Sequence, residues 1–436
     1  MSAMLESLQD NFSRQPEAPG GEPVHQVRAQ AMKEFLGSGL PGPRDEYWKY
    51  TRLRAFEKRN FGLPREKPIS GDNIGIQNLD AIRIVFVDGI YSPILSDETA
   101  LAENGIRLLA DALRDDPGLA GGLLPQSDEA THRFAALNRA FQAQGVILEL
   151  TAGQELARPL YLLFHSQQTS QGTVSHPRIL IKAGSNSKAT LIEHYDGETD
   201  TAGFCNALTE IDLASGAQFT HYRIQTESDT ALHVGSFFAR QAENSRMVSH
   251  NLSLGGKLAR INMQIELLGR GAELVLNGLY LAGGRQHIDN HTLVNHREPG
   301  AISFQDYRGI VDGKARAVFC GKAVVHADAQ QTEARQSNRN LLLSDGAEID
   351  TQPVLEIYAD DVQCSHGATI GQLDNDALFY LRSRGVSEEE ALRLLTFAFA
   401  EDVVLRLENQ TVRDAITRHL IGRLPDLEDA EELVAI

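Results

Sequence analysis

Short runs in which apolar and polar residues alternate fill the chain from Gly145 to about Ile370. Alternation with a period of two predicts strands that bury one face, and no helical pattern interrupts the series. Each run closes on Gly, Asn or Asp, which are typical turn residues. Because so many strands exceed what a single sandwich needs, we predict a mainly β fold with a solenoid core over residues 145–371. A pair of β-sandwiches is the alternative.

The dipeptide Gly-Ala recurs along this region and suggests a degenerate repeat. It stands at Gly216, Gly271, Gly300, Gly346 and Gly367, each time beside an apolar residue or one position from it. A turn residue that restarts a strand in every repeat is typical of solenoids. We therefore expect these glycines to lie at turns, and Gly367 to end the strand before it.

Residues 1–144 carry mixed patterns that predict an N-terminal helical and α/β region. Apolar residues at helical spacing indicate an amphipathic helix over 22–36, and a second short helix surrounds Trp48. The sequence RIVFVDGIYSPILS indicates two strands that turn at Asp88-Gly89. Two further helices are expected over 100–114 and 128–143.

Residues 372–436 are expected to form a C-terminal helical domain. NDALFYLRSRG indicates one helix, Ser387 and Glu390 form a capping box for a second that runs through Leu407, and Thr411 with Asp414 indicates the start of a third. We expect these helices to cover an open end of the solenoid, where backbone groups would otherwise be unpaired. The aromatic run LFYL would either pack on that end or anchor a partner.

Composition narrows the function classes. The 436 residues carry 59 acidic and 41 basic side chains, for a formal charge of −18, and no Lys/Arg-rich run interrupts them. Nucleic acid and membrane are therefore not expected as partners. Three cysteines without a CxxC pair, and an N-terminus without an apolar core, predict a cytoplasmic protein.

Cys364 and His366 stand two residues apart at the end of the β region, in DDVQCSHG. In a strand both side chains would point to one face, where a thiolate and an imidazole can bind a transition metal. Two ligands do not hold an iron–sulfur cluster, which takes four. We therefore expect any missing ligands to come from another chain.

The segment that begins IYADDVQCSHGATIGQLDNDALFYLRSRG, together with WKYTRLRAF at residues 48–56, resembles the SufB/SufD family of the SufBCD iron–sulfur cluster assembly scaffold. The resemblance covers roughly the last four-fifths of the chain and implies a parallel β-helix core. SufB-type members carry an essential cysteine at or beside the position of Ala347, and a glutamate where this chain has Gly367. Because both ligands are absent here, the resemblance is to the SufD branch.

The resemblance implies a scaffold subunit that is not an enzyme. It would pair with a SufB-like homologue through the β-helix and bind a SufC-like ATPase through the C-terminal helices. Cys364 and His366 would be the cofactor and metal ligands, toward a transient iron–sulfur cluster shared with the SufB-like subunit. No cofactor is expected to be held stably by the isolated chain.

Two alternatives stay open: a SufB-like subunit that bears the cluster itself, and a β-helix enzyme such as a polysaccharide lyase or metal-dependent hydrolase. Against an enzyme, the chain has no phosphate-binding loop, no GxSxG and no HExxH. Cys205 and Cys320 stand in apolar strand contexts typical of inert buried thiols. The histidines of the strands are expected to be hydrogen-bonded on strand faces or at turns: His221, His233, His250, His287, His291, His296 and His326.

Overall fold

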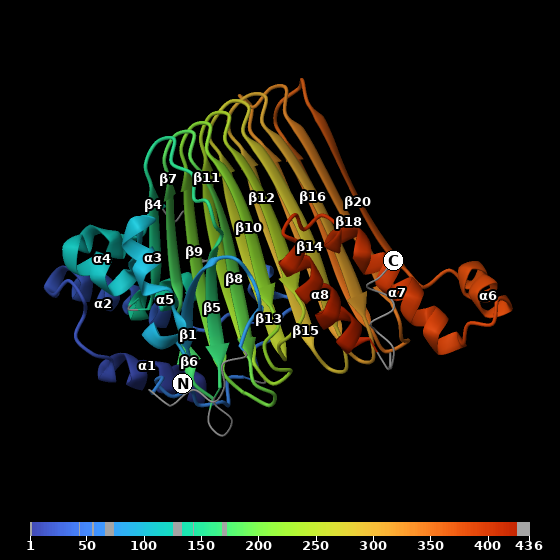
Figure 1. The fold of residues 1–436 in the computed structure, drawn as a ribbon, viewed down its shortest axis with the longest axis horizontal. Coiled ribbons are helices and arrows are strands. Elements are labelled where there is room, and N and C mark those ends of the chain that lie inside the picture. Colours follow the sequence, from blue (N-terminus) through green and yellow to red (C-terminus); the bar gives the residue numbers. More distant parts are fainter. Residues whose placement is uncertain are drawn as a thin grey trace.

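The computed structural model describes residues 2–42, 44–54, 56–65, 74–124, 133–142, 144–167 and 172–424. Two large sheets face each other and form the walls of a solenoid that runs from one side of the molecule to the other (Figure 1). From β7 onward the chain passes from one sheet to the other with each successive strand, and strands within a sheet pair in parallel with their neighbours of the next coil. The predicted mainly β fold with a parallel solenoid core is confirmed, and the β-sandwich alternative is wrong.

Each sheet has ten strands and is named here by its last strand. The β20 sheet has the order β2-β1-β5-β8-β10-β12-β14-β16-β18-β20, and the β19 sheet has the order β19-β17-β15-β13-β11-β9-β7-β4-β3, with β6 beside β9. In the first sheet the strands are β1 (Ile82–Val87), β2 (Ile90–Tyr91), β5 (Leu160–Ser166), β8 (Lys188–Gly197), β10 (Gln218–Gln225), β12 (Arg246–Ser253), β14 (Glu273–Ala282), β16 (Ile302–Val311), β18 (Glu333–Leu342) and β20 (Gln363–Gly371). In the second they are β3 (Ile106–Leu108), β4 (Gly145–Leu150), β6 (Val174–Ser175), β7 (Arg178–Ala183), β9 (Phe204–Leu213), β11 (Leu232–Gln241), β13 (Leu258–Leu267), β15 (His287–His296), β17 (Arg316–Val325) and β19 (Glu348–Ile357).

The inward-facing side chains of both sheets form one continuous apolar core, which extends from Ile82 and Ile106 at the N-terminal end to Phe319 and Ala347 near the other end. Inward residues alternate with outward ones along each strand, as the period of two requires. Strands of this kind bury their core faces only by stacking, so each coil depends on its neighbours for stability.

N-terminal helices cover the outer face of the β19 sheet. They pack there through apolar side chains such as Phe35, Trp48, Phe134 and Leu113. The helical elements of this region are α1 (Ala3–Arg14), α2 (Glu22–Ser38), η1 (Glu46–Trp48), η2 (Pro93–Leu95), α3 (Glu98–Glu103), α4 (Leu109–Asp115), η3 (Pro117–Gly121) and α5 (Arg133–Phe141).

Sequence patterns in this region were only partly right. The helices over 22–36 and at Trp48 and the turn at Asp88-Gly89 are confirmed. The single helix expected over 100–114 is wrong, because β3 separates α3 from α4 and pairs antiparallel with β4. Pairing with a strand far along the chain overrides the local helical pattern. Of the helix expected over 128–143, α5 is seen, and residues 128–132 lie outside the described residues.

The C-terminal helices are α6 (Asn375–Ser383), α7 (Glu388–Val404) and α8 (Gln410–Arg423). Ser387 Oγ accepts a hydrogen bond from Glu390 N, so this predicted cap is confirmed. The third helix is capped by Asn409 and not by Thr411. None of the helices in the described residues is long and apolar enough to cross a membrane.

The expected position of these helices is also wrong. Val403, Leu407 and Ile416 pack against Ile224, Leu252 and other outward side chains of the β20 sheet, so α7 and α8 lie on its outer face (Figure 1). The end of the solenoid at β19 and β20 is left uncovered by them. Helix α6 extends away from the sheets and buries none of its residues.

The repeated glycines behave as turn residues with one exception. Gly216, Gly271 and Gly300 have φ near +70°, in the left-handed region that glycine adopts without strain. Gly367 instead lies in the middle of β20, opposite Ser337 of β18. The expectation that it ends the strand is wrong, and Cys364 and His366 stand on a longer strand than the sequence suggested.

Candidate ligand site at the open end of the solenoid

Cys364 and His366 lie on β20, the outermost strand of its sheet. In the described residues β20 pairs with β18 alone, and β19, the outermost strand of the other sheet, pairs with β17 alone. Cys364 stands opposite Ala334 and His366 opposite Gln336, both of which are buried inward residues of β18. The two side chains therefore continue the row of core-facing positions at a coil that no further coil covers.

The two side chains differ in their surroundings. His366 is exposed, whereas Cys364 is half-buried and contacts the small apolar cluster of Val325, Ala329 and Ala359. Burial raises the pKa of the Cys364 thiol, against a smaller lowering by a backbone hydrogen bond with Ala334. The thiol is therefore protonated at neutral pH and becomes a metal ligand only when a metal displaces its proton.

The two positions at which the resemblance implies a ligand in SufB-type chains are occupied here by Ala347 and Gly367. Ala347 is buried in the turn before β19 and contributes its methyl group to the core. A side chain at Gly367 would meet open space, on the face opposite to Cys364 and His366. The open end therefore offers two donor side chains, and a cluster held there needs ligands from outside this chain.

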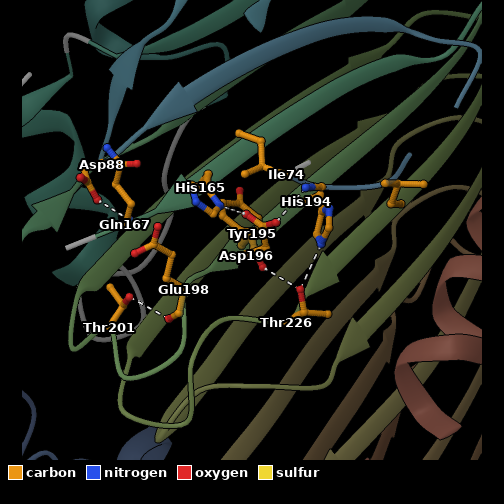
Figure 2. A network of polar contacts seen from close by, with 12 residues as sticks. Ile74, Asp88, His165, Gln167, His194, Tyr195, Asp196, Glu198, Thr201 and Thr226 are labelled. Carbon is orange, nitrogen blue, oxygen red and sulfur yellow. Dashed lines mark hydrogen bonds and ion pairs between the residues drawn. The ribbon is translucent and has the colours of Figure 1, made fainter. Parts of the chain in front are cut away.

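Many histidines elsewhere take part in hydrogen-bond networks, one of which is drawn in Figure 2. His165 Nδ1 lies 2.7 Å from Asp196 Oδ1. The pKa of His165 is raised, because the hydrogen bond and charge of Asp196 outweigh the desolvation that lowers it. His194 lies 2.9 Å from the Tyr161 hydroxyl and 3.0 Å from Thr226 Oγ1. These rings hold neighbouring coils together.

The histidines that the sequence singled out are dispersed in the same way. His221 contacts Ser249 and Glu193, and His296 contacts Ser303. His287 lies 2.7 Å from Thr51 Oγ1. Their partners confirm that these three are hydrogen-bonded, and the structure does not gather them into one site.

One cluster was missed by sequence reasoning. Within the residues that the structure describes, the group of His, Cys and carboxylate side chains that could hold a metal ion is Cys205, Glu227 and His233. The alignment of neighbouring coils could have revealed this cluster, because Cys205 and His233 stand opposite each other on β9 and β11, one coil apart. Cys320, the remaining cysteine, is half-buried beside a cavity of about 320 Å³ that Tyr47, Lys49 and Met263 also line.

Comparison with known proteins gives a consistent result. A family profile described as "SUF system FeS cluster assembly, SufBD core domain" matches residues 165–399, and one described as "SufBD protein N-terminal region" matches residues 17–162. Together they span both the solenoid and the N-terminal region.

Similar proteins come from bacteria and plants. The chain is 34% identical to "Iron-sulfur cluster assembly protein SufD" of Escherichia coli, over 91% of this chain and 92% of that protein. It is 33% identical to a SufBD family protein of Synechocystis, over 86% of both chains. It is also 28% identical to the chloroplastic protein ABCI7 of Arabidopsis thaliana, over 97% of this chain and 90% of that protein.

Proposed function

The chain belongs to the SufB/SufD family of iron–sulfur cluster assembly proteins and is of the SufD type, and we propose that it is a non-enzymatic scaffold subunit whose open end receives a SufB-like homologue. The observation that carries this proposal is the uncovered pair of edge strands beside Cys364 and His366. Among the described residues, the other end of the solenoid ends in the short strands β2 and β3 and has no comparable surface.

Backbone geometry supports pairing at this end. β19 has ten residues and β20 has nine, and each presents one row of unpaired backbone groups to its outer side. A second solenoid can add a strand to each sheet and satisfy those groups. Exposed apolar side chains accompany the edges: Ile357, Tyr358 and Ile370. An apolar surface at a sheet edge is typical of a protein interface.

His366 and Cys364 lie at that edge, where ligands from a partner could complete a cluster site. The donors offered here are one imidazole and one thiol, and the partner would supply the rest. Binding a cluster between two chains makes its release depend on the interface. That dependence suits a scaffold that hands its cluster to a recipient protein.

The SufC-like ATPase would bind at α6. Phe379 is 74% exposed and Tyr380 58% exposed, on a helix that buries none of its residues. A cavity of about 420 Å³ lies between α6, α7 and the turn after β18, lined by Leu378, Leu392 and Thr396 among others. The lining of this cavity mixes leucines with polar and charged side chains. Exposed aromatic side chains beside such a cavity are typical of binding hot spots. The alternative that the aromatic run packs on the solenoid end is wrong for these two rings.

A series of ion pairs and hydrogen bonds links the segment after α7 to the open end. Arg406, after α7, lies 2.7 Å from Asp306 of β16, which in turn lies 3.1 Å from Arg339 of β18. Asn340 of β18 donates to the Thr369 carbonyl of β20. Movement of α7 by an ATPase would therefore be transmitted through β16 and β18 to the edge that carries His366.

The test uses the complex. We would co-express the chain with SufB-like and SufC-like proteins and measure iron and sulfide on the purified assembly, comparing wild type with His366→Ala. The variant should assemble normally, because an exposed residue contributes little to stability, and should lose most of its cluster. Cys364→Ser should have a smaller effect, because His366 remains.

Ser365→Ala is the matched control, since Ser365 is exposed on the opposite face of the same strand. An assembly that forms normally but in which His366→Ala holds as much cluster as Ser365→Ala would show that His366 is not a ligand. For the ATPase, Phe379→Ala with Tyr380→Ala should weaken capture, with Leu405→Ala, also exposed, as control. If the double variant captures the ATPase as wild type does, the ATPase does not bind at α6.

A further inference from the structure

We propose that Cys205, Glu227 and His233 form a binding site for one divalent transition-metal ion, of the class of Zn²⁺ or Fe²⁺, inside the solenoid. The ligand atoms of the three residues lie within 4.8 Å of one another. All three are buried. The site lies far along the chain from the open end and does not depend on the proposed function.

Three elements bring the residues together. Cys205 on β9 and His233 on β11 are paired in register, so their side chains point the same way from adjacent strands. Glu227 comes from the turn between β10 and β11, and its Oε2 lies 2.7 Å from His233 Nδ1. The rings of Tyr195 and His233 form an edge-to-face contact, with centroids 4.8 Å apart, that holds His233 in place.

His233 has an unsatisfied nitrogen. Burial lowers the pKa of His233, so the ring is neutral and carries one N–H. Because Nδ1 is the ring nitrogen that faces Glu227, Nδ1 is the atom that would share a metal ion with the carboxylate, and the hydrogen would then lie on Nε2. Nε2 is buried without a hydrogen-bond partner.

The charges around the site favour a dication. Arg223 on β10 and Glu193 on β8 act on the cluster with opposite signs. The Glu227 carboxylate and, once deprotonated, the Cys205 thiolate would balance the two positive charges of the ion. In the absence of metal, burial raises the pKa of Cys205 well above its usual value, so the thiol is protonated.

The donor set selects the class of metal. Sulfur and imidazole nitrogen favour Zn²⁺ and related first-row ions over Mg²⁺ and Ca²⁺, which prefer oxygen. Tetrahedral zinc separates its ligand atoms by roughly 3.5 Å. The three donors lie within 4.8 Å of one another, and the 2.7 Å between Glu227 Oε2 and His233 Nδ1 would open to admit the ion. Three protein ligands leave a fourth coordination position. This site departs from the expectations that Cys205 is inert and that the isolated chain holds no metal.

Metal binding to the isolated, tag-free, full-length chain tests the proposal. Protein stripped with a chelator would be titrated with Zn²⁺, and with Co²⁺ as a chromophoric probe of thiolate coordination. We expect one equivalent that survives desalting, a sulfur-to-cobalt absorption band, and release of about one proton per ion at neutral pH, because the Cys205 thiol must ionise. Cys205→Ala should weaken binding more than tenfold and abolish the band.

Cys320→Ala is the matched control, because it removes another free thiol and leaves both proposed sites intact, and it should bind as wild type does. Folding is followed by circular dichroism. If Cys205→Ala does not fold, Glu227→Gln replaces it and should also weaken binding more than tenfold. The proposal is wrong if folded wild type retains no equivalent, or if folded Cys205→Ala or Glu227→Gln binds as wild type does.

Discussion

At its N-terminal end the solenoid is closed, and at its C-terminal end it is open. The outermost strands at the closed end are β2, with two residues, and β3, with three. Strand β2 pairs antiparallel with β1, and β3 pairs antiparallel with β4. Ala100 of α3 and Ile106 of β3 belong to the core and plug the space between the sheets. The open end stops at β19 and β20, which have ten and nine residues and no such plug in the described residues.

Short edge strands and covering helices are the usual protection of a sheet edge against pairing with other chains. Both protections are present at one end, and in the part of the chain that the structure describes both are missing at the other end, although the coils are otherwise alike. A long edge strand that carries an exposed apolar side chain, such as Ile357 on β19 or Ile370 on β20, is a hazard unless a partner covers it. The difference therefore indicates that the open end is an interface, and that the closed end contributes stability.

Removing the ion pair near the closed end should have the largest effect on stability. Arg178 on β7 and Glu210 on β9 have fully buried side chains 2.9 Å apart, and Arg178 also donates to the Ala120 carbonyl of η3. Glu210→Leu leaves Arg178 buried without its counter-ion and should cost about 3–5 kcal/mol of unfolding free energy. Urea denaturation of wild type and Glu210→Leu measures this loss of unfolding free energy.

The matched variant lies near the open end. Asp350→Leu breaks the partly exposed pair with Arg316, whose atoms are 2.6 Å apart, and should cost about 1 kcal/mol or less. Equal costs for the two variants would contradict the view that stability is concentrated at the closed end.

Acid should weaken the anchoring of α5. His176 stacks on Phe141 with centroids 4.2 Å apart, and desolvation lowers its pKa to about 3. The unfolded chain takes up this proton near pH 6.5, so the contribution of neutral His176 is complete above that pH and is lost as pH falls toward 3. Between pH 8 and pH 5 the loss should be about 2 kcal/mol.

His176→Gln does not titrate and should lower that pH dependence by about the same amount in urea denaturation at the two pH values. If the variant shows the same dependence as wild type, the acid sensitivity comes from other groups.

A charge at the open end should weaken pairing without weakening the fold. Ile370→Lys places a lysine at a residue that is 49% exposed on β20, and we expect stability to change by less than about 0.5 kcal/mol. Affinity for the SufB-like subunit should fall at least tenfold, because the ammonium group would be buried in the interface. Ile94→Lys is the control, since Ile94 is 94% exposed on η2 at the closed end. Equal loss of affinity in both variants would remove the distinction between the ends.

The sequence predicted the solenoid because its signal is local and repeated. Alternation and turn residues recur in every coil, and Gly216, Gly271 and Gly300 adopt the backbone conformation that makes glycine useful at a turn. The same dipeptide at Gly367 was misread, because pairing with β18 and not the dipeptide decides that β20 continues. Likewise, the placement of α7 and α8 depends on the outer face of the β20 sheet, which no local pattern reveals.

The candidate ligands were predictable to the extent that they are close in sequence. Cys364 and His366 share a strand, so the period of two places them on one face. Whether they bind a cluster stays a prediction. Cys205, Glu227 and His233 come from two strands and a turn, and only the register of β9 with β11 brings them together. Finding them from sequence requires the repeat to be aligned coil by coil.

Hydrogen exchange on the chain alone and in complex with the SufB-like subunit tests the open end most directly. The backbone amides of β19 and β20 that are unpaired in the isolated chain should exchange freely there and become strongly protected in the complex. Those of β2, β3 and α3 should be unchanged. Protection at the closed end, or a stable complex in which β19 and β20 gain none, would contradict the account.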